Sequence, residues 1–137
     1  MKILVLGLPG SGKTTLAKLL YLHLKCPWFN ADLIREQFND WDFSKEGRLR
    51  QAERMSLLAK SSIESGHKYV ICDFVAPTEE IRTIYNADYT IWMDTIPKGR
   101  FDDTNRVFVP PEHYDIRVTE QNAEFWVNFI VQDLLLK

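Results

Sequence analysis

The feature that most constrains this chain is a glycine-rich segment near its start. Residues 7–14 read Gly-Leu-Pro-Gly-Ser-Gly-Lys-Thr and fit the pattern G-x-x-x-x-G-K-[ST], between an apolar run at 3–6 and the helix-like sequence 16–20. Glycines let backbone N–H groups turn inward around a phosphate, and a helix N-terminus adds partial positive charge. A chance glycine-rich turn is the alternative, but it would leave Lys13 a half-buried cation without a partner. The segment predicts a loop that binds a nucleoside triphosphate.

The same pattern assigns roles within the loop. We expect Lys13 to reach the β- and γ-phosphates and the Thr14 hydroxyl to hold Mg²⁺. The residues expected at the nucleotide are Gly7, Pro9, Gly10, Ser11, Gly12, Lys13, Thr14 and Thr15.

Length and composition limit the other possibilities. A chain of 137 residues with 45% apolar and 26% charged residues is typical of one globular domain. A net charge of −2 gives no general attraction to nucleic acid, so we expect no such partner. Two thiols, Cys26 and Cys72, indicate a reducing compartment rather than a disulfide framework. No run approaches the roughly 18 apolar residues of a membrane span, and the start does not resemble a signal peptide, so we expect a cytoplasmic protein with no membrane partner.

Apolar periodicity and turn residues predict strands that alternate with helices. Residues 95–111, with little periodicity, scattered prolines and many charges, are expected to form a mobile lid or a binding loop. Alternation of this kind predicts an α/β fold in three layers, with a five-stranded parallel sheet flanked by helices. The expected strands are Lys2–Gly7, Trp28–Asn30, Lys68–Phe74, Tyr89–Met93 and Asp115–Val118, and the expected helices are Lys13–Lys25, Asp32–Asn39, Ser44–Ser65 (with Ser44 as N-cap), Pro77–Tyr85 and Ala123–Leu136 (with Thr119 as N-cap).

Several polar residues follow the expected strands. Gly7, Asp32, Asp73 and Asp94 all fall near strand ends. Ligands of parallel sheets bind beyond the carboxyl ends of the strands. This convergence predicts an active site at that edge.

Two segments supply candidates for the acceptor side of a phosphoryl transfer. Asp32 follows a strand and is suited to orient a hydroxyl or hold a metal-bound water; capping of its own helix is the alternative. Arg35, on the same helical face, suits an oxyanion, unless it forms only a surface salt bridge. Arg48 and Gln51 are three residues apart in the first turns of the long helix and can face one ligand, or they belong to a solvated face. Asp73, at the end of an apolar strand, is suited to hold Mg²⁺ through water, unless it caps the next turn.

Taken together, these segments resemble the adenylylsulfate (APS) kinases, a family of P-loop kinases. Residues 7–15 resemble the family's GLSGAGKTT, 30–35 its DGDNVR, 43–48 its FSxxDR, 74–77 its FISP, 94–95 its VDTP strand end and 101–111 its FTGIDDPYEPP. Gln51 stands at the asparagine of the family's ENIRR. Apart from the glycine-rich loop each motif is loose, but their order along the chain is specific.

The resemblance implies a single P-loop kinase domain over residues 1–137, with a lid at about 95–111. It implies transfer of the γ-phosphate of ATP, with Mg²⁺, to the 3′-hydroxyl of adenylylsulfate, a step of sulfate assimilation. Related kinases are often dimers, so a homodimer is an expected assembly. The implied catalytic residues are Lys13 and Asp32, and the metal would be held by Thr14 and Asp73. The phosphosulfate and ribose of the acceptor would be contacted by Arg35, Arg48 and Gln51. Its adenine would lie between Phe43 and Phe101, and the main chain near Phe74 to Pro77 would complete the pocket.

This chain departs from the family pattern at several places. The first aspartate of DGD is Asn30, the aspartate before Arg48 is Gly47, and the serine of FISP is Ala76. Asp73 stands where the family often has a small polar residue. The lid is much shorter, leaving Lys98, Arg100 or Arg106 to supply the cation that the family's lid provides. These departures leave two alternatives open: a kinase for another nucleotide or small-molecule hydroxyl, and an ATP-binding module without transfer activity.

Overall fold

The computed structural model describes residues 1–137. Strands alternate with helices along the chain, except that two helices follow one another between β2 and β3. Every expected strand and helix is present, with ends within two residues of those predicted from the sequence. The strands are β1 (Lys2–Gly7), β2 (Trp28–Asn30), β3 (Val70–Asp73), β4 (Tyr89–Met93) and β5 (Ile116–Val118); the helices are α1 (Lys13–Leu24), α2 (Ala31–Phe38), α3 (Lys45–Glu64), α4 (Glu79–Tyr85), α5 (Asp102–Val107) and α6 (Ala123–Leu135).

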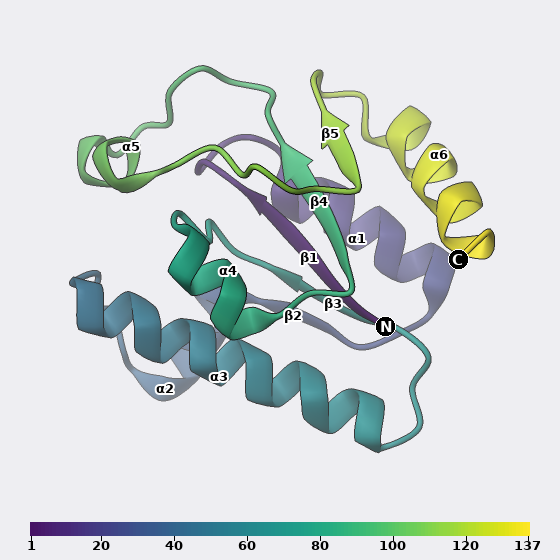
Figure 1. The fold of residues 1–137 in the computed structure, drawn as a ribbon, viewed down its shortest axis with the longest axis horizontal. Helices are drawn as coiled ribbons and strands as arrows, with labels where there is room; N and C mark the ends of the chain where they lie inside the picture. Colours follow the sequence, from purple (N-terminus) through teal and green to yellow (C-terminus); the bar gives the residue numbers. More distant parts are fainter.

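The strands form one parallel sheet in the order β2-β3-β1-β4-β5 (Figure 1). Strand β1 lies in the centre, with β3 and β2 on one side of it and β4 and β5 on the other. A ligand crevice is expected where the strand order reverses, at the carboxyl end of β1. The glycine-rich loop begins at that point.

Side chains of the central strand alternate between two buried layers. Ile3 and Val5 face a core shared with α1 and α6, whereas Leu4 and Leu6 face a core shared with α3 and α4. Figure 1 shows α1 and α6 on one side of the sheet and α3 and α4 on the other. Both faces of a parallel sheet are covered in this way, which explains the continuous apolar run of β1. The three-layer α/β prediction is confirmed. None of the helices combines the length and the apolar character that a membrane span requires.

One helix was not predicted, and one helix cap was predicted wrongly. The segment at 95–111 contains α5, whose first turn carries Asp102 and Asp103, and acidic side chains stabilise a helix N-terminus. Thr119 does not cap α6; Asn122 precedes that helix, and its side chain makes no capping hydrogen bond. A threonine just after β5 looked like a start signal, but the chain needs three further residues to turn from the sheet edge into α6.

The start of α3 is closed by a capping arrangement that uses residues on both sides of it. The hydroxyl of Ser44 accepts from the backbone N–H of Gly47 at 3.2 Å, as predicted for an N-cap. The carboxylate of Asp42 accepts from the backbone N–H of Ser44 at 2.9 Å. In a capping box that second bond is made by an acidic side chain at the third helical position. Here that position is Gly47, and the carboxylate arrives instead from the preceding loop.

Gly47 leaves the space that this loop occupies. A Cβ at residue 47 would lie 2.1 Å from the carbonyl oxygen of Asp42 and 2.6 Å from its carboxyl carbon. We therefore expect Gly47→Ala to lower the free energy of unfolding by about 3 kcal/mol, the upper part of the range for overpacking. Urea denaturation of the two proteins measures this difference. The exposed neighbour Lys45, replaced by alanine, should change it by less than about 0.5 kcal/mol; equal stabilities of the Gly47→Ala and wild-type proteins would contradict the packing argument.

Candidate active site

The phosphate loop, residues 7–14, joins β1 to α1 and is held in shape by its glycines. Gly7, Gly10 and Gly12 have φ angles of +155°, +89° and +97°. A Cβ at Gly7 would lie 2.7 Å from the carbonyl oxygen of Met93, so the loop passes too close to β4 for any larger residue. The backbone N–H of Ser11 donates to the Leu8 carbonyl oxygen at 3.1 Å.

The loop lysine lies inside this loop. Lys13 Nζ donates to the Leu8 carbonyl oxygen at 3.1 Å. Burial lowers the pKa of Lys13 to about 8, while the negative charges of Asp73 and Asp32 raise it. The positive charge of Arg100 lowers it further. Three charged groups from β3, α2 and the lid therefore act on one ammonium group, which places all of them around the phosphate loop.

Two side chains support the loop from outside, and sequence reasoning missed their role. The Thr95 hydroxyl donates to the Ser11 carbonyl oxygen at 2.7 Å, and the Gln121 amide donates to the Gly10 carbonyl oxygen at 3.1 Å. Thr95 follows β4, where the strand-end pattern was a usable signal. Nothing in the sequence marks Gln121, because its contact depends on how the turn before α6 approaches the loop.

A buried carboxylate connects the edge of the sheet to the phosphate loop. Asp73 is 2% exposed; it accepts from Trp28 Nε1 at 2.6 Å and from Asn30 Nδ2 at 2.9 Å. The same Asn30 amide lies 3.3 Å from Thr14 Oγ1. Burial raises the pKa of Asp73, and the bonds and charges of Trp28, Lys13 and Asn30 oppose that rise. Asn30 thereby links Asp73 to Thr14. The prediction that Asp73 holds Mg²⁺ through water remains a prediction.

Asn30, not Asp32, caps helix α2. The side-chain oxygen of Asn30 accepts from the backbone N–H of Leu33 at 3.1 Å. Asp32 lies in the first turn, is exposed, and makes no hydrogen bond or ion pair within the protein. The capping alternative for Asp32 is therefore wrong. Its carboxylate is free, near Lys13, at the carboxyl edge of the sheet.

Two of the four polar residues predicted for the acceptor, Arg35 and Gln51, are bonded inside the protein. Arg35 is 4% exposed, and its Nη1 donates to the carbonyl oxygens of Asp40 at 2.9 Å and Asp42 at 3.2 Å. The alternative of a surface salt bridge is wrong for Arg35, since its partners are backbone carbonyls. Gln51 donates to the Ala31 carbonyl oxygen at 3.0 Å and accepts from Arg54 at 2.7 Å.

Arg48, by contrast, is half-buried, and its side chain has no hydrogen-bond or ion-pair partner in the protein. Together with Asp32 it is one of two charged side chains on the acceptor side that remain free for a ligand. The prediction that Arg48 and Gln51 face one ligand remains a prediction.

The aromatic residues predicted for the acceptor divide into two kinds. Phe43 and Phe101 are 52% and 55% exposed, so both rings are accessible, and the Arg35 guanidinium stacks 4.2 Å from the centre of the Phe43 ring. Phe74 is 7% exposed and packs edge-on against Tyr85 within the core. The Phe74 ring is therefore part of the core and is not accessible to a ligand in the way that the Phe43 and Phe101 rings are.

The lid, residues 95–111, is attached to the phosphate loop at Gly99. A Cβ there would lie 3.2 Å from the Pro9 carbonyl oxygen. Both backbone groups of Gly99 bond to the Asn105 side chain, at 2.8 and 2.9 Å. Arg100 follows directly, and its charge reaches Lys13. Lys98 and Arg106 are exposed, and Arg106 faces Asp103 across 3.9 Å.

Comparison with known proteins agrees with this geometry. The sequence model of the adenylylsulphate kinase family matches residues 1–94, more than half of the chain. The chain belongs to the adenylylsulphate kinase family. No curated protein sequence matches it.

Solved structures share the fold at low sequence identity. The Mycobacterium tuberculosis APS kinase CysC, in complex with AMPPNP and APS, has a TM-score of 0.81 at 20% identity and covers 99% of this chain and 97% of its own. The hexameric APS kinase from Thiobacillus denitrificans has a TM-score of 0.75 at 21% identity, covering 97% of this chain and 28% of its own. Shikimate kinase from Aquifex aeolicus has a TM-score of 0.68 at 21% identity, covering 98% and 96%. The P-loop kinase fold is thereby confirmed.

Two departures from the family pattern lie beside a carboxylate in this structure. At position 47, where the APS kinase pattern has an aspartate, the neighbouring Asp42 accepts from the backbone N–H of Ser44. At position 30, where the pattern also has an aspartate, Asn30 is in register with Asp73 on the adjacent strand and donates to it.

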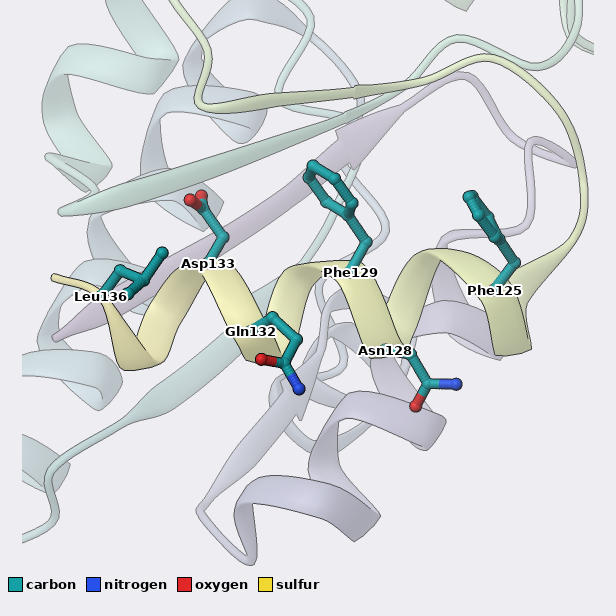
Figure 2. A pocket seen from close by; sticks show the side chains of 6 residues that line it. All are labelled: Phe125, Asn128, Phe129, Gln132, Asp133 and Leu136. Atoms are coloured by element: carbon teal, nitrogen blue, oxygen red, sulfur yellow. The ribbon is translucent and has the colours of Figure 1, made fainter.

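A shallow groove elsewhere on the surface belongs to helix α6. Figure 2 shows Phe125, Phe129 and Leu136 rising from one side of this helix, with Asn128 and Gln132 on the other. None of the lining residues is among those predicted for catalysis, ATP or the acceptor.

The Asn30–Asp73 pair leads to a double-variant prediction. Trp28 and Asn30 both donate to the Asp73 carboxylate, so Asp73→Asn would place a donor NH₂ group against one of these donors. Asn30→Asp would place a second carboxylate against that of Asp73. Each single change should therefore lower the free energy of unfolding by about 1–3 kcal/mol. The combined variant restores donor–acceptor matching, because the amide introduced at position 73 can accept from Trp28 and donate to the carboxylate introduced at position 30.

Chemical denaturation of the four proteins at neutral pH measures the coupling, which we expect to be about 2 kcal/mol in favour of the double variant. As a control, Asn30→Asp combined with Asp133→Asn, at a carboxylate that contacts Tyr89 instead, should be additive. Additive losses for the 30/73 pair would rule out the exchanged-charge interpretation.

Proposed function

We propose that this protein is an ATP-dependent kinase that transfers the γ-phosphoryl group to a hydroxyl of a nucleotide, with the 3′-hydroxyl of adenylylsulfate as the favoured acceptor. The observation that carries the proposal is the free carboxylate of Asp32, in the first turn of the helix that Asn30 caps. The amide of Asn30 lies 3.3 Å from Thr14 Oγ1 of the phosphate loop. A phosphoryl transfer requires little covalent help from the protein; it requires a positioned acceptor hydroxyl and neutralised phosphate charge.

On the donor side, the phosphate-loop amides and Lys13 bind the terminal phosphates. Thr14 Oγ1 suits Mg²⁺, because it is an exposed oxygen and Asn30 approaches it with a donor hydrogen, leaving a lone pair for the cation. When bound, Mg²⁺ would neutralise developing negative charge. Asp73 orients Asn30 and so helps to position the Thr14 hydroxyl.

On the acceptor side, Asp32 accepts a hydrogen bond from the attacking hydroxyl and aligns it with the γ-phosphate. The Phe43 and Phe101 rings are accessible for stacking on a purine. Arg48 supplies the unpaired cation for an anionic group of the acceptor. The internal bonds of Arg35 and Gln51 shape the surrounding wall.

A second candidate retains the kinase chemistry with another hydroxyl acceptor. Its support is that Arg35 and Gln51 are already bonded inside the protein, which leaves fewer groups for a phosphosulfate. A module without transfer activity is disfavoured, because it would have no need of a free carboxylate beside the phosphate loop.

The direct test supplies purified protein with MgATP and adenylylsulfate and measures the 3′-phosphorylated product. We expect turnover that Lys13→Ala abolishes. A panel of other adenine nucleotides, sugars and small alcohols, followed by ADP release, identifies a different acceptor. ATP binding without turnover on any acceptor would disprove the kinase proposal.

Asp32 is tested by the isosteric change Asp32→Asn. Loss of an acceptor group positioned at the attacking hydroxyl should lower kcat by about 100-fold or more, with a change in ATP affinity of less than about threefold. Glu36→Gln, at an exposed carboxylate one turn later on α2, is the matched control and should leave kcat unchanged. An unchanged kcat in Asp32→Asn would remove this residue from the mechanism.

The lid cation is tested by replacing each candidate with methionine. Arg100 is the one whose charge acts on Lys13, so Arg100→Met should lower kcat by about 100-fold, the effect of losing one charge-stabilising donor. Lys98→Met and Arg106→Met should fall within about twofold of wild type in steady-state assays. A larger loss at either of those positions would reassign the cation.

A further inference from the structure

Outside the site, one buried arginine joins two segments that are far apart in the sequence. Arg82, on α4, is 9% exposed. Its Nε donates to the Ala76 carbonyl oxygen at 2.8 Å, and its Nη2 donates to the Val109 carbonyl oxygen. Its Nη1 donates to Glu79 at 2.7 Å, and the guanidinium lies 5.4 Å from the centre of the Phe108 ring. A guanidinium presents five N–H donors in a rigid planar fork and can hold acceptors on three sides at fixed positions, whereas an ammonium group has three donors on one atom.

The two segments that Arg82 joins are the end of the lid and the loop after β3. The backbone N–H of Val109 donates to the Pro77 carbonyl oxygen at 2.7 Å, so the chains at 76–77 and 108–109 lie side by side. Ala76 has a φ of +46°, a left-handed conformation that alanine rarely adopts. The bond from Arg82 to the Ala76 carbonyl oxygen stabilises that conformation.

The lid is consequently fastened at both ends. Near its start, Gly99 packs on the phosphate loop, and at its end, Val109 is held against the 74–77 loop by Arg82. The 74–77 loop follows Asp73 directly, and Asp73 is bonded to Asn30 beside the phosphate loop. A guanidinium that holds both segments fixes the distance between the lid and the acceptor side.

We propose that Arg82 is a positioning residue that holds the 74–77 loop and the end of the lid in one arrangement, and so sets the shape of the acceptor pocket. This inference rests on the proposed function for its consequence in catalysis. The hydrogen bonds of Arg82 all go to groups of the protein itself, so it acts through Ala76 and Val109. A purely structural role would instead lower stability and leave the kinetic constants of the folded protein unchanged.

The test compares Arg82→Met and Arg82→Lys with Glu79→Gln, in which the ion-pair partner is replaced and the guanidinium stays. In acceptor kinetics we expect Arg82→Met to raise KM for the acceptor at least about tenfold and to lower kcat, because small misplacements of a pocket cost up to about 100-fold. KM for ATP should stay within about twofold. Arg82→Lys should recover little, and Glu79→Gln should match wild type.

A second readout does not depend on activity. Hydrogen exchange of the full-length protein should show faster exchange at the Val109 amide and in residues 105–109 of Arg82→Met, with the amides of β1 and β3 unchanged. If Arg82→Met does not fold, Val109→Pro tests the same connection from the lid side, since it removes the N–H that donates to Pro77. Phe108, with φ −71° and ψ 120°, already has a conformation that a following proline permits.

Unchanged exchange near Val109, or unchanged KM for the acceptor together with faster exchange, would overturn the inference. If wild-type protein phosphorylates no acceptor while Arg82→Met still loosens residues 105–109, the proposed function fails and the connection between the two segments stands. If Arg82→Met keeps full activity and its hydrogen exchange is unchanged, the proposed function stands and the inference about Arg82 fails.

Discussion

The carboxylate of Asp73, buried at the end of β3, is the interaction on which the site depends. It accepts hydrogen bonds from Trp28 and Asn30, both on β2, and so fixes a short edge strand that has only three residues to pair with. Asn30 in turn caps α2 and reaches Thr14 of the phosphate-loop helix. Burial of a carboxylate is costly, and two strong donors offset that cost. One charge therefore positions the strand, the helix that carries Asp32 and the hydroxyl at the phosphate loop.

The lid, residues 95–111, is held in the protein at two points. Gly99 lies against the Pro9 carbonyl oxygen, and Arg82 holds the Val109 carbonyl oxygen. Each residue that becomes ordered when a lid closes costs conformational entropy. A lid with both ends held, and a helix between them, has fewer residues left to order.

Motifs at the carboxyl edge of the sheet were predictable from the sequence. The phosphate loop, the strand ends and the cap at Ser44 depend on local patterns of glycines, apolar runs and capping side chains, which act over a few residues. Those patterns also located Asp32 near the loop. They could not reveal that Arg35 and Gln51 use their hydrogen-bonding groups on backbone carbonyls, because those carbonyls are brought to them by the fold. Helix α5 was missed for a related reason: its six residues have no buried face, so they lack the apolar period that identifies longer helices.

The substitutions that separate this chain from the APS kinase pattern illustrate the same division. Gly47 and Asn30 are uncharged at positions where the pattern has an aspartate. In the structure, the carboxylate of Asp42 bonds at the start of the helix that contains Gly47, and the carboxylate of Asp73 bonds to Asn30. The sequence by itself determined the parallel α/β sheet, the phosphate loop and the residue types at the strand ends, because these follow from short-range periodicity and glycine conformation. Only the tertiary structure decided which polar side chains remain free for a ligand, since that depends on partners far apart in the chain.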